Sequence, residues 1–404
     1  MRVFIIGGGA SGMAAALTAA ENPSNQVTLL ERQARVGRKL AATGNGRCNL
    51  TNLNTCVSMY HGDDPCFVTP ALQEFSVENT LAWFRKLGLL TVAEENGKVY
   101  PFSDQAGSVV DVLRLAIERS SVKLETSCDV TSVCYREDAF FIQTTERLYA
   151  ADCVIIACGG KAGGKLGGVN AGYAFLKSFG HTCTKLYPSL VQLKTDPTWV
   201  RSLKGVRAEA KIRLICNGTV IQENRGEVQF TEFGLSGPAI FELSRSAAVS
   251  EGEICAELDL MPLLETDELT ELLAQKANAY PSIPLENYLT GTVQNRLGRT
   301  VLRACGLPLE VPSTVLKKRD YHAIAAMLKG FSLPVIGTMG LENAQVTAGG
   351  IRTDEFNPET LESRLQPGLY ACGEVLDIDG DCGGLNLQWA WSSGRLAGEL
   401  RGNK

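Results

Sequence analysis

Three glycines near the N-terminus have the spacing of a turn that binds a phosphate group. Gly7, Gly9 and Gly12 form a G-x-G-x-x-G pattern, in which the first glycine allows a tight turn and the second lets the backbone approach a pyrophosphate. The third lets a helix pack close to a strand, and the N–H groups at the start of that helix face the phosphates. Glu31 follows Gly12 by 19 residues, where a carboxylate can accept both hydroxyls of a ribose. These residues predict a site for an adenine dinucleotide.

Three alternating carboxylates near the C-terminus raise the question of a metal site. Asp377, Asp379 and Asp381 have the spacing of ligands in a calcium loop. Such a loop also needs a glycine and a glutamate at the positions where this sequence has Cys382 and Gln388. We therefore expect no metal here and interpret the aspartates as turn and cap residues.

The elements that must position these residues follow from the apolar runs. VFII precedes the glycines, MAAALTAAE follows them and VTLL ends at Glu31, which is the order strand, turn, helix, strand. This alternation predicts an α/β fold with a doubly wound, Rossmann-like domain at 1–184 and 337–404. Between them, at 185–336, short alternating runs and an Asn217-Gly218 hairpin turn predict an inserted domain. We expect that domain to be β-rich and barrel-like, with additional helices.

The segment after Glu31 is basic, with five basic residues and no acid between Arg32 and Arg47. Such a segment suits the pyrophosphate and ribityl chain of a flavin dinucleotide. Here the chain resembles the glutathione-reductase-like FAD superfamily, in which Gly373-Glu374 would close over the ribityl chain.

A narrower resemblance is to the bacterial BaiN/RdsA-type, or aminoacetone-oxidase-like, FAD-binding flavoproteins. It spans nearly the whole chain and rests on four segments, 36–52, 226–244, 345–351 and 368–398. The sequence departs from the family pattern in the loop 166–173 and at Leu385, where we expect a tyrosine. We expect both departures to lie on the substrate side of the flavin.

The resemblance implies non-covalent FAD held by the glycine turns, the basic segment and the C-terminal motifs. A glycine pair precedes Asn386 at the start of a helix, whose free N–H groups would stabilise negative charge on a reduced flavin. The expected FAD-binding residues are Gly7, Gly9, Ser11, Gly12, Glu31, Arg32, Arg38, Lys39, Gly46, Arg47, Cys48, Asn49, Val130, Gly159, Gly373, Glu374, Gly384, Asn386 and Leu387.

Cys48 is the candidate catalytic residue, because a thiol near the flavin could protonate one carbon while hydride arrives at its neighbour. The alternative is a small buried residue that packs beneath the ring, as free cysteines commonly do. The three histidines, His61, His181 and His322, carry no motif. We expect His181, in SFGHTC, to cap a helix end.

Composition limits the class of protein. A chain of 404 residues with 45% apolar and 21% charged residues is long enough for two packed domains. Its thirteen cysteines include no C-x-x-C pair, which fits neither a disulfide framework nor a zinc site and predicts a reducing cytoplasm. No apolar run reaches the length of a membrane span or a secretion signal.

The net charge of −5 argues against a protein that coats nucleic acid with its whole surface, but the inserted domain is uneven. Residues 185–213 contain seven basic and two acidic side chains, and 296–319 contain six and one. If both segments fold onto one face, they form a phosphate-binding patch. The alternative is that these side chains are solvated on separate faces.

The family resemblance implies hydride chemistry on activated C=C bonds. The implied substrates are uridine in 23S rRNA, reduced to dihydrouridine, or an unsaturated 3-oxo bile acid or steroid. With only one dinucleotide motif present, we expect NAD(P)H to dock transiently as the electron donor. Oxidation of a small amine such as aminoacetone is an alternative activity, and a non-enzymatic flavoprotein that binds RNA or a partner is another.

Overall fold

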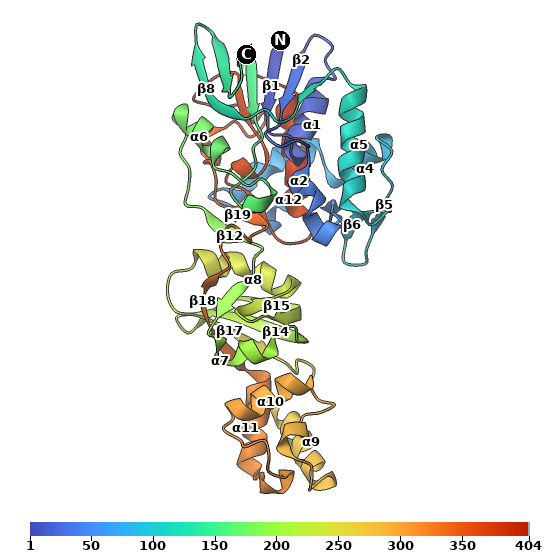
Figure 1. Cartoon of the computed structure of the whole chain (residues 1–404), viewed down its shortest axis with the longest axis vertical. Coiled ribbons are helices and arrows are strands. Elements are labelled where there is room, and N and C mark those ends of the chain that lie inside the picture. Colours follow the sequence, from blue (N-terminus) through green and yellow to red (C-terminus); the bar gives the residue numbers. More distant parts are fainter. Residues whose placement is uncertain (403–404) are drawn as a thin grey trace. The chain divides into compact units, whose positions relative to one another are not determined.

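The computed structural model describes residues 1–402 and divides the chain into two compact units (Figure 1). Unit 1 contains Met1–Tyr187 and the chain from Leu341 onward, and unit 2 contains Pro188–Gly340. Each unit has its own cluster of buried apolar side chains. Unit 2 is therefore an insertion in the sequence of unit 1.

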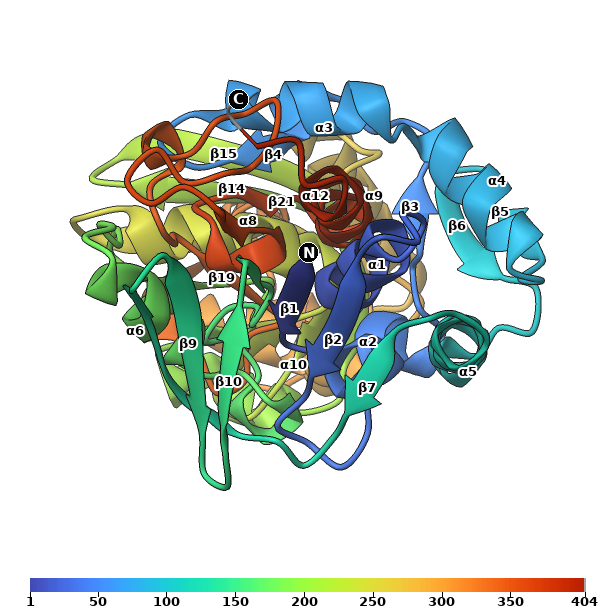
Figure 2. The same cartoon turned by 90° about the horizontal axis from the view of Figure 1, so that it is seen from above.

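A five-stranded parallel sheet forms the centre of unit 1 (Figure 2). Except for the edge strand β7, its strands are short apolar runs that are largely buried, as expected when both faces of a parallel sheet are covered. Their order across the sheet is β20 (Leu369–Ala371), β11 (Cys153–Ile156), β1 (Arg2–Ile6), β2 (Gln26–Leu30) and β7 (Lys123–Glu125).

Helices α1 (Ala10–Ala19) and α12 (Leu385–Gly398) lie side by side in unit 1 (Figure 2). Gly394 and Gly398 of α12 allow this close approach. A Cβ atom on Gly394 would lie 2.4 Å from the carbonyl oxygen of Ser11, and one on Gly398 would lie 2.5 Å from that of Ala15. At these two glycines the backbone of the C-terminal helix therefore packs directly against the backbone of the N-terminal helix.

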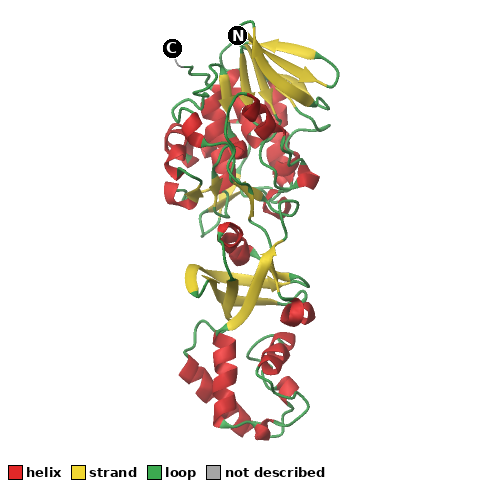
Figure 3. Ribbon diagram, turned by 90° about the vertical axis from the view of Figure 1, so that its left-hand side faces the viewer, coloured by secondary structure: helices red, strands yellow, loops and turns green. Residues whose placement is uncertain are grey.

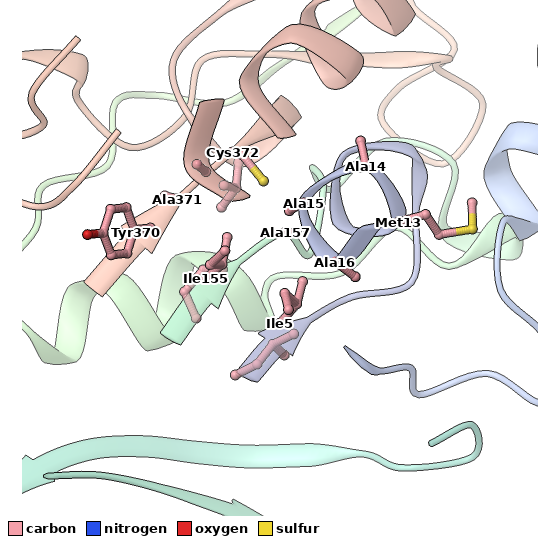
Figure 4. Packing of buried hydrophobic residues seen from close by; sticks show 14 of the residues in the cluster. Ile5, Met13, Ala14, Ala15, Ala16, Ile155, Ala157, Tyr370, Ala371 and Cys372 are labelled. Carbon is pink, nitrogen blue, oxygen red and sulfur yellow. The ribbon is translucent and has the colours of Figure 1, made fainter. Parts of the chain in front are cut away.

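The core of unit 1 joins helix α1 to the sheet (Figure 4). Ala14, Ala15 and Ala16 of α1 are fully buried, as are Ile5 of β1 and Ile155 of β11. Small side chains on the helix let it pack close to the branched side chains of the strands, and this packing fixes the position of the turn between β1 and α1.

Smaller elements complete unit 1. A three-stranded antiparallel sheet contains β8 (Val130–Arg136), β9 (Ala139–Thr144) and β10 (Leu148–Ala151), and another contains β3 (Thr51–Asn52), β5 (Thr91–Ala93) and β6 (Lys98–Pro101). The remaining helices are α2 (Arg38–Ala41), α3 (Thr69–Glu74), α4 (Val77–Lys86), α5 (Ala106–Arg119) and α6 (Ala171–Ser178).

Unit 2 contains a closed six-stranded barrel and a group of helices, which Figure 3 separates by colour. Asn217 and Gly218 connect β14 to β15 with φ values of +49° and +82°, as a two-residue hairpin turn requires. The barrel order is β13 (Leu193–Thr195), β16 (Gly234–Ser236), β15 (Thr219–Phe230), β14 (Arg207–Cys216), β17 (Ile254–Asp259) and β18 (Phe331–Thr338). The helices are α7 (Pro197–Val200), α8 (Pro238–Val249), α9 (Thr266–Ala279), α10 (Asn295–Ala304) and α11 (Lys318–Lys329).

The predicted fold class is confirmed. Unit 1 has the parallel sheet of a Rossmann-type fold, and unit 2 combines a barrel with helices. Within residues 1–402 no helix has both the length and the apolar character that a bilayer crossing requires.

Candidate cofactor site

The glycines of the turn between β1 and α1 have two different roles. Two of them allow close packing, and one faces open space. A Cβ atom on Gly7 would lie 2.4 Å from the carbonyl oxygen of Ala157, and Gly7 has a φ of +112°. A Cβ atom on Gly12 would lie 1.8 Å from the carbonyl oxygen of Gly7. A Cβ atom on Gly9 would meet no protein atom within 4 Å. Gly9 is therefore the position where the turn leaves room for a phosphate.

Glu31 follows β2 and lies directly beside this turn. Its Oε2 accepts a hydrogen bond from the backbone N–H of Gly8 at 2.7 Å, and its Oε1 accepts one from Gln33 at 2.7 Å. Each carboxylate oxygen has a second lone pair, so both can still accept ribose hydroxyls. The N–H of Cys128 donates to the carbonyl oxygen of Glu31 at 2.9 Å. This bond brings the start of β8, where Val130 is the first residue, close to Glu31.

An ion pair joins the basic segment to the C-terminal motif. Lys39 Nζ lies 2.6 Å from Oε2 of Glu374, and Oε1 of Glu374 accepts the N–H of Thr347 at 2.8 Å. A Cβ atom on Gly160 would lie 2.6 Å from the same Oε1, so the turn after β11 contacts this carboxylate as well. Residues more than 300 positions apart in sequence thus meet at the carboxyl ends of the central strands.

Further predicted glycines lie at the same edge of the sheet. A Cβ atom on Gly373 would lie 2.6 Å from Oγ of Ser11 in the first turn of α1, so these two predicted residues are neighbours. Gly46 and Gly159 have positive φ values, and a Cβ atom on either would meet nothing within 4 Å. Like Gly9, these two positions face space that no protein atom fills.

An acceptor without a donor lies beside the N-terminus of α12. Oδ1 of Asn49 is buried and has no hydrogen-bond partner among the described residues, and it lies 2.9 Å from where a Cβ atom on Gly384 would be. Gly384 is the N-cap of α12, with a φ of +100°. The side chain of Asn386 instead holds the preceding loop, because it accepts the N–H of Gly380 at 2.9 Å and donates to its carbonyl oxygen at 2.7 Å. Leu387, in the same first turn, is half-buried.

Three predicted basic residues are directed elsewhere or exposed. Nε of Arg47 lies 2.5 Å from Asp104 and its Nη2 lies 3.1 Å from Glu94, so its guanidinium belongs to a surface ion-pair network. Arg32 and Arg38 are exposed. Their roles as FAD ligands stay predictions.

Cys48 lies in a strained part of this segment, with a φ of +62°, and its side chain is fully buried. Burial raises the pKa of its thiol to about 11, with a hydrogen bond to Thr43 acting in the opposite direction. The thiol therefore keeps its proton at neutral pH. Its burial favours the packing interpretation over contact with a substrate.

A histidine–carboxylate pair lies next to the α12 terminus, and sequence reasoning missed it. His61 belongs to β4 (Tyr60–His61), which pairs antiparallel with β21 (Asp379–Gly380). Nε2 of His61 lies 2.7 Å from Oδ1 of Asp381, and the two side chains are 33% and 36% exposed. The N–H of Asp381 donates to the carbonyl oxygen of Met59 at 3.0 Å, which fixes the carboxylate relative to β4. No local sequence signal connects residues 320 positions apart.

The prediction that His181 caps a helix is confirmed for its backbone, because the N–H of His181 donates to the carbonyl oxygen of Leu176 in the last turn of α6 at 3.3 Å. Its side chain is buried, with Nδ1 2.9 Å from Oε2 of Glu355 and Nε2 2.8 Å from Oγ of Ser363. The ring stacks on Phe356 with centroids 4.5 Å apart. Burial lowers the pKa of His181, and Glu355 opposes that shift.

These features fit a flavin dinucleotide. The open positions at Gly9, Gly46 and Gly159 leave room for the cofactor, and the start of α1 supplies backbone donors for phosphates. Asn49 supplies a buried acceptor that the protein itself leaves unpaired. Among residues 1–402 no group of His, Cys, Asp or Glu side chains is arranged to hold a metal ion.

Comparison with known proteins finds similar sequences over nearly the whole chain. The sequence matches the HI0933-like protein Rossmann domain over residues 1–400. The chain belongs to this family. It is 40% identical over 401 residues to a 3-dehydro-bile acid delta(4,6)-reductase of Clostridium scindens, covering 98% of each chain. It is also 32% identical over 392 residues to the ribosomal RNA dihydrouridine synthase of Escherichia coli, covering 96% of this chain and 95% of the relative.

Among solved structures, the open conformation of a flavocytochrome c3 fumarate reductase is similar, with a TM-score of 0.50 and 15% identity. The match covers 99% of this chain and 77% of that protein. At this identity the likeness concerns the fold alone.

Proposed function

We propose that this member of the HI0933-like family is an FAD-dependent reductase that adds hydrogen across a conjugated C=C bond, with uridine in ribosomal RNA as its substrate. The observation that carries the proposal is the pair of whole-chain relatives, whose names denote the reduction of ring C=C bonds in two different molecules. A shared reaction with different substrates is expected when the cofactor site is common and the substrate contacts differ.

The residues that would hold FAD lie at one edge of the central sheet. The turn at Gly9 and the start of α1 would bind the pyrophosphate, and Glu31 would bind a ribose. The Lys39–Glu374 ion pair, with N···O at 2.6 Å, would hold the two chain segments that flank the rest of the cofactor. When bound, FAD supplies the hydride.

The first turn of α12 would stabilise negative charge. Its backbone N–H groups have no partner within the helix, and the positive end of the helix dipole lies there. Asn386 keeps the approach loop in place through its two hydrogen bonds to Gly380. The N–H groups are therefore pre-arranged, which is the condition for effective electrostatic stabilisation.

We propose His61 as the proton donor in place of Cys48. A fully buried thiol does not reach a substrate, whereas the imidazole of His61 is partly exposed and is held in place by Asp381, with Nε2 2.7 Å from Oδ1. The proton would pass from the imidazolium to the carbon next to the one that receives hydride. Solvent would then reprotonate the ring.

The ribosomal RNA substrate draws support from unit 2, where the two basic segments are in contact. Nη1 of Arg296, at the start of α10, donates to the carbonyl oxygen of Lys204 at 3.1 Å. Most of the first segment is neutralised, however, because four of its cations form ion pairs with carboxylates: Lys204 with Glu232, Arg207 with Glu227, Lys211 with Glu223 and Arg213 with Glu257. The unpaired cations of this segment therefore matter most for binding a polyanion.

A small unsaturated 3-oxo steroid or bile acid is the second candidate substrate, and the relative at 40% identity favours it. NAD(P)H is proposed as the transient electron donor. All thirteen cysteines are free thiols, which suits the reducing cytoplasm where ribosomes are made.

Anaerobic reoxidation separates these alternatives. The purified holoprotein is reduced with NADPH and then mixed with unmodified 23S rRNA, an unsaturated 3-oxo steroid, or air. Rapid reoxidation by rRNA supports the proposal, and reoxidation by the steroid alone moves the assignment to a small-molecule reductase. Rapid reoxidation by air, with turnover of aminoacetone, would instead identify an amine oxidase.

A further inference from the structure

A hollow on the barrel of unit 2 has a volume of about 460 Å³, within the range of small-ligand sites. It lies where β13, β16 and β18 run together, next to α7. Its lining residues are Lys194, Thr195, Pro197, Arg201, Glu232, Phe233 and Ile336.

The hollow exists because Lys194 has no side chains opposite it. On β13, Lys194 pairs with Gly234 of β16 on one side and Gly337 of β18 on the other. Gly234 has a φ of +155°, and a Cβ atom there would lie 2.1 Å from the carbonyl oxygen of Leu193, so the position excludes any larger residue. The stem of Lys194 therefore lies in an open groove between two bare backbones.

An aromatic side chain is held at the edge of this groove. Phe233 is 54% exposed although the turn that bears it is firmly fixed. Its N–H donates to Oγ1 of Thr231 at 3.3 Å, and its carbonyl oxygen accepts the N–H of Thr195 at 3.0 Å. Ile336, which is 67% exposed, lines the same hollow. A pre-arranged, exposed aromatic ring beside an apolar side chain is suited to stacking against a flat ligand.

The charge of the hollow is positive. Among the described residues, neither Lys194 nor Arg201 forms an ion pair with a carboxylate, whereas Glu232 is paired with Lys204 at 2.6 Å. Two unpaired cations and a neutralised acid favour an anionic ligand.

We propose that this hollow binds one nucleotide of single-stranded RNA, with the base stacked on Phe233 and the phosphate held by Lys194 and Arg201. Exposed aromatics combined with cations are the means by which proteins bind single strands, because every base has a π-face and every nucleotide a phosphate. Ile336 provides an apolar contact for the edge of the base. The inference rests on the proposed function, because it assigns a binding site for the RNA substrate.

Direct binding to a fluorescent, uridine-rich single-stranded RNA tests this site in the full-length holoprotein. Phe233→Ala is expected to weaken binding about 5- to 150-fold, and Phe233→Trp should restore it. Replacing both Lys194 and Arg201 by Ala should lower the slope of log affinity against log salt by about 0.7, because the contact to one phosphate is lost.

Matched controls come from unit 1. Phe102→Ala removes a phenylalanine that is 71% exposed, and Arg85→Ala with Lys86→Ala removes two exposed cations. These variants should keep wild-type affinity and salt slope. Flavin content and thermal stability, measured for every variant, establish that each is folded.

Wild-type RNA affinity in Phe233→Ala would overturn the inference, even if the holoprotein reduces uridine. Loss of RNA binding in that variant supports the site, even if no uridine is reduced, and the proposed function alone would then fail. Binding of cholate that Phe233→Ala abolishes, without RNA binding at low salt, would assign the hollow to an amphipathic small anion and also overturn the inference.

Discussion

Gly9 and Gly12 belong to one motif, yet the structure predicts opposite outcomes for substitutions at these two positions. Gly9 has ordinary extended φ and ψ values of −80° and −169°, and its missing side chain faces open space. Gly9→Val should therefore change the free energy of unfolding of the apoprotein by no more than about 1 kcal/mol, mainly through the altered helix N-cap. A valine there would occupy the space that the pyrophosphate needs. Loss of one charged hydrogen bond, about 1.5–3 kcal/mol, would weaken FAD about 10- to 150-fold.

Gly12→Ala should do the reverse. Its Cβ atom would lie 1.8 Å from the carbonyl oxygen of Gly7, so helix α1 must move away from β1. Overpacking of this kind costs about 3 kcal/mol or more when a backbone atom is the obstacle, which corresponds to a fall in Tm of about 6–12 °C for a domain of this size.

The assay is calorimetric titration of each apoprotein with FAD, together with thermal unfolding in the absence of FAD. Apoproteins are compared because bound ligand itself raises Tm. Full flavin occupancy and wild-type affinity in Gly9→Val would refute the assignment of the turn as the pyrophosphate site. An unchanged Tm in Gly12→Ala would refute the packing account.

Two further predictions concern histidines. His61→Asn should slow product formation about 100-fold or more, while NADPH still reduces the flavin at the wild-type rate. Cys48→Ala should change neither flavin reduction nor product formation. Rapid-mixing absorbance measures both steps, and unchanged turnover in His61→Asn would exclude His61 as the proton donor. His181 has a pKa below that of an unfolded-state histidine, so the unfolded chain binds the extra proton first and stability should fall as pH drops below about 6.5. Denaturant unfolding at several pH values should show this loss in the wild type and not in His181→Gln, and equal pH dependence in both proteins would contradict it.

The sequence predicts those parts of the fold that depend on local pattern. The run VFII with Gly7, Gly9 and Gly12 contains the strand, turn and helix within a dozen residues, and Asn217-Gly218 contains a hairpin. Each is fixed by short-range sterics, because a positive φ or a close backbone contact demands glycine or asparagine.

The contacts between distant segments could not be predicted in the same way. The pairing of His61 with Asp381 depends on β4 meeting β21, and the ion pair of Lys39 with Glu374 depends on the assembled sheet edge. The position of His181 directly after a helix predicts its backbone cap, whereas the partners of its side chain come from a different part of the chain. The count of basic residues in 185–213 likewise does not predict the charge available for binding, because the sequence does not reveal which cations form ion pairs with carboxylates.

The mass of the RNA product tests most directly whether this protein reduces uridine in ribosomal RNA. Unmodified 23S rRNA is incubated with the FAD-loaded protein and NADPH, digested to nucleosides and analysed by mass spectrometry. We expect a uridine that gains the mass of two hydrogens, in a yield that depends on both FAD and NADPH and is reduced in the Gly9→Val variant. Uridine of unchanged mass in rRNA, alongside reduction of a 3-oxo steroid under the same conditions, would contradict the proposed substrate.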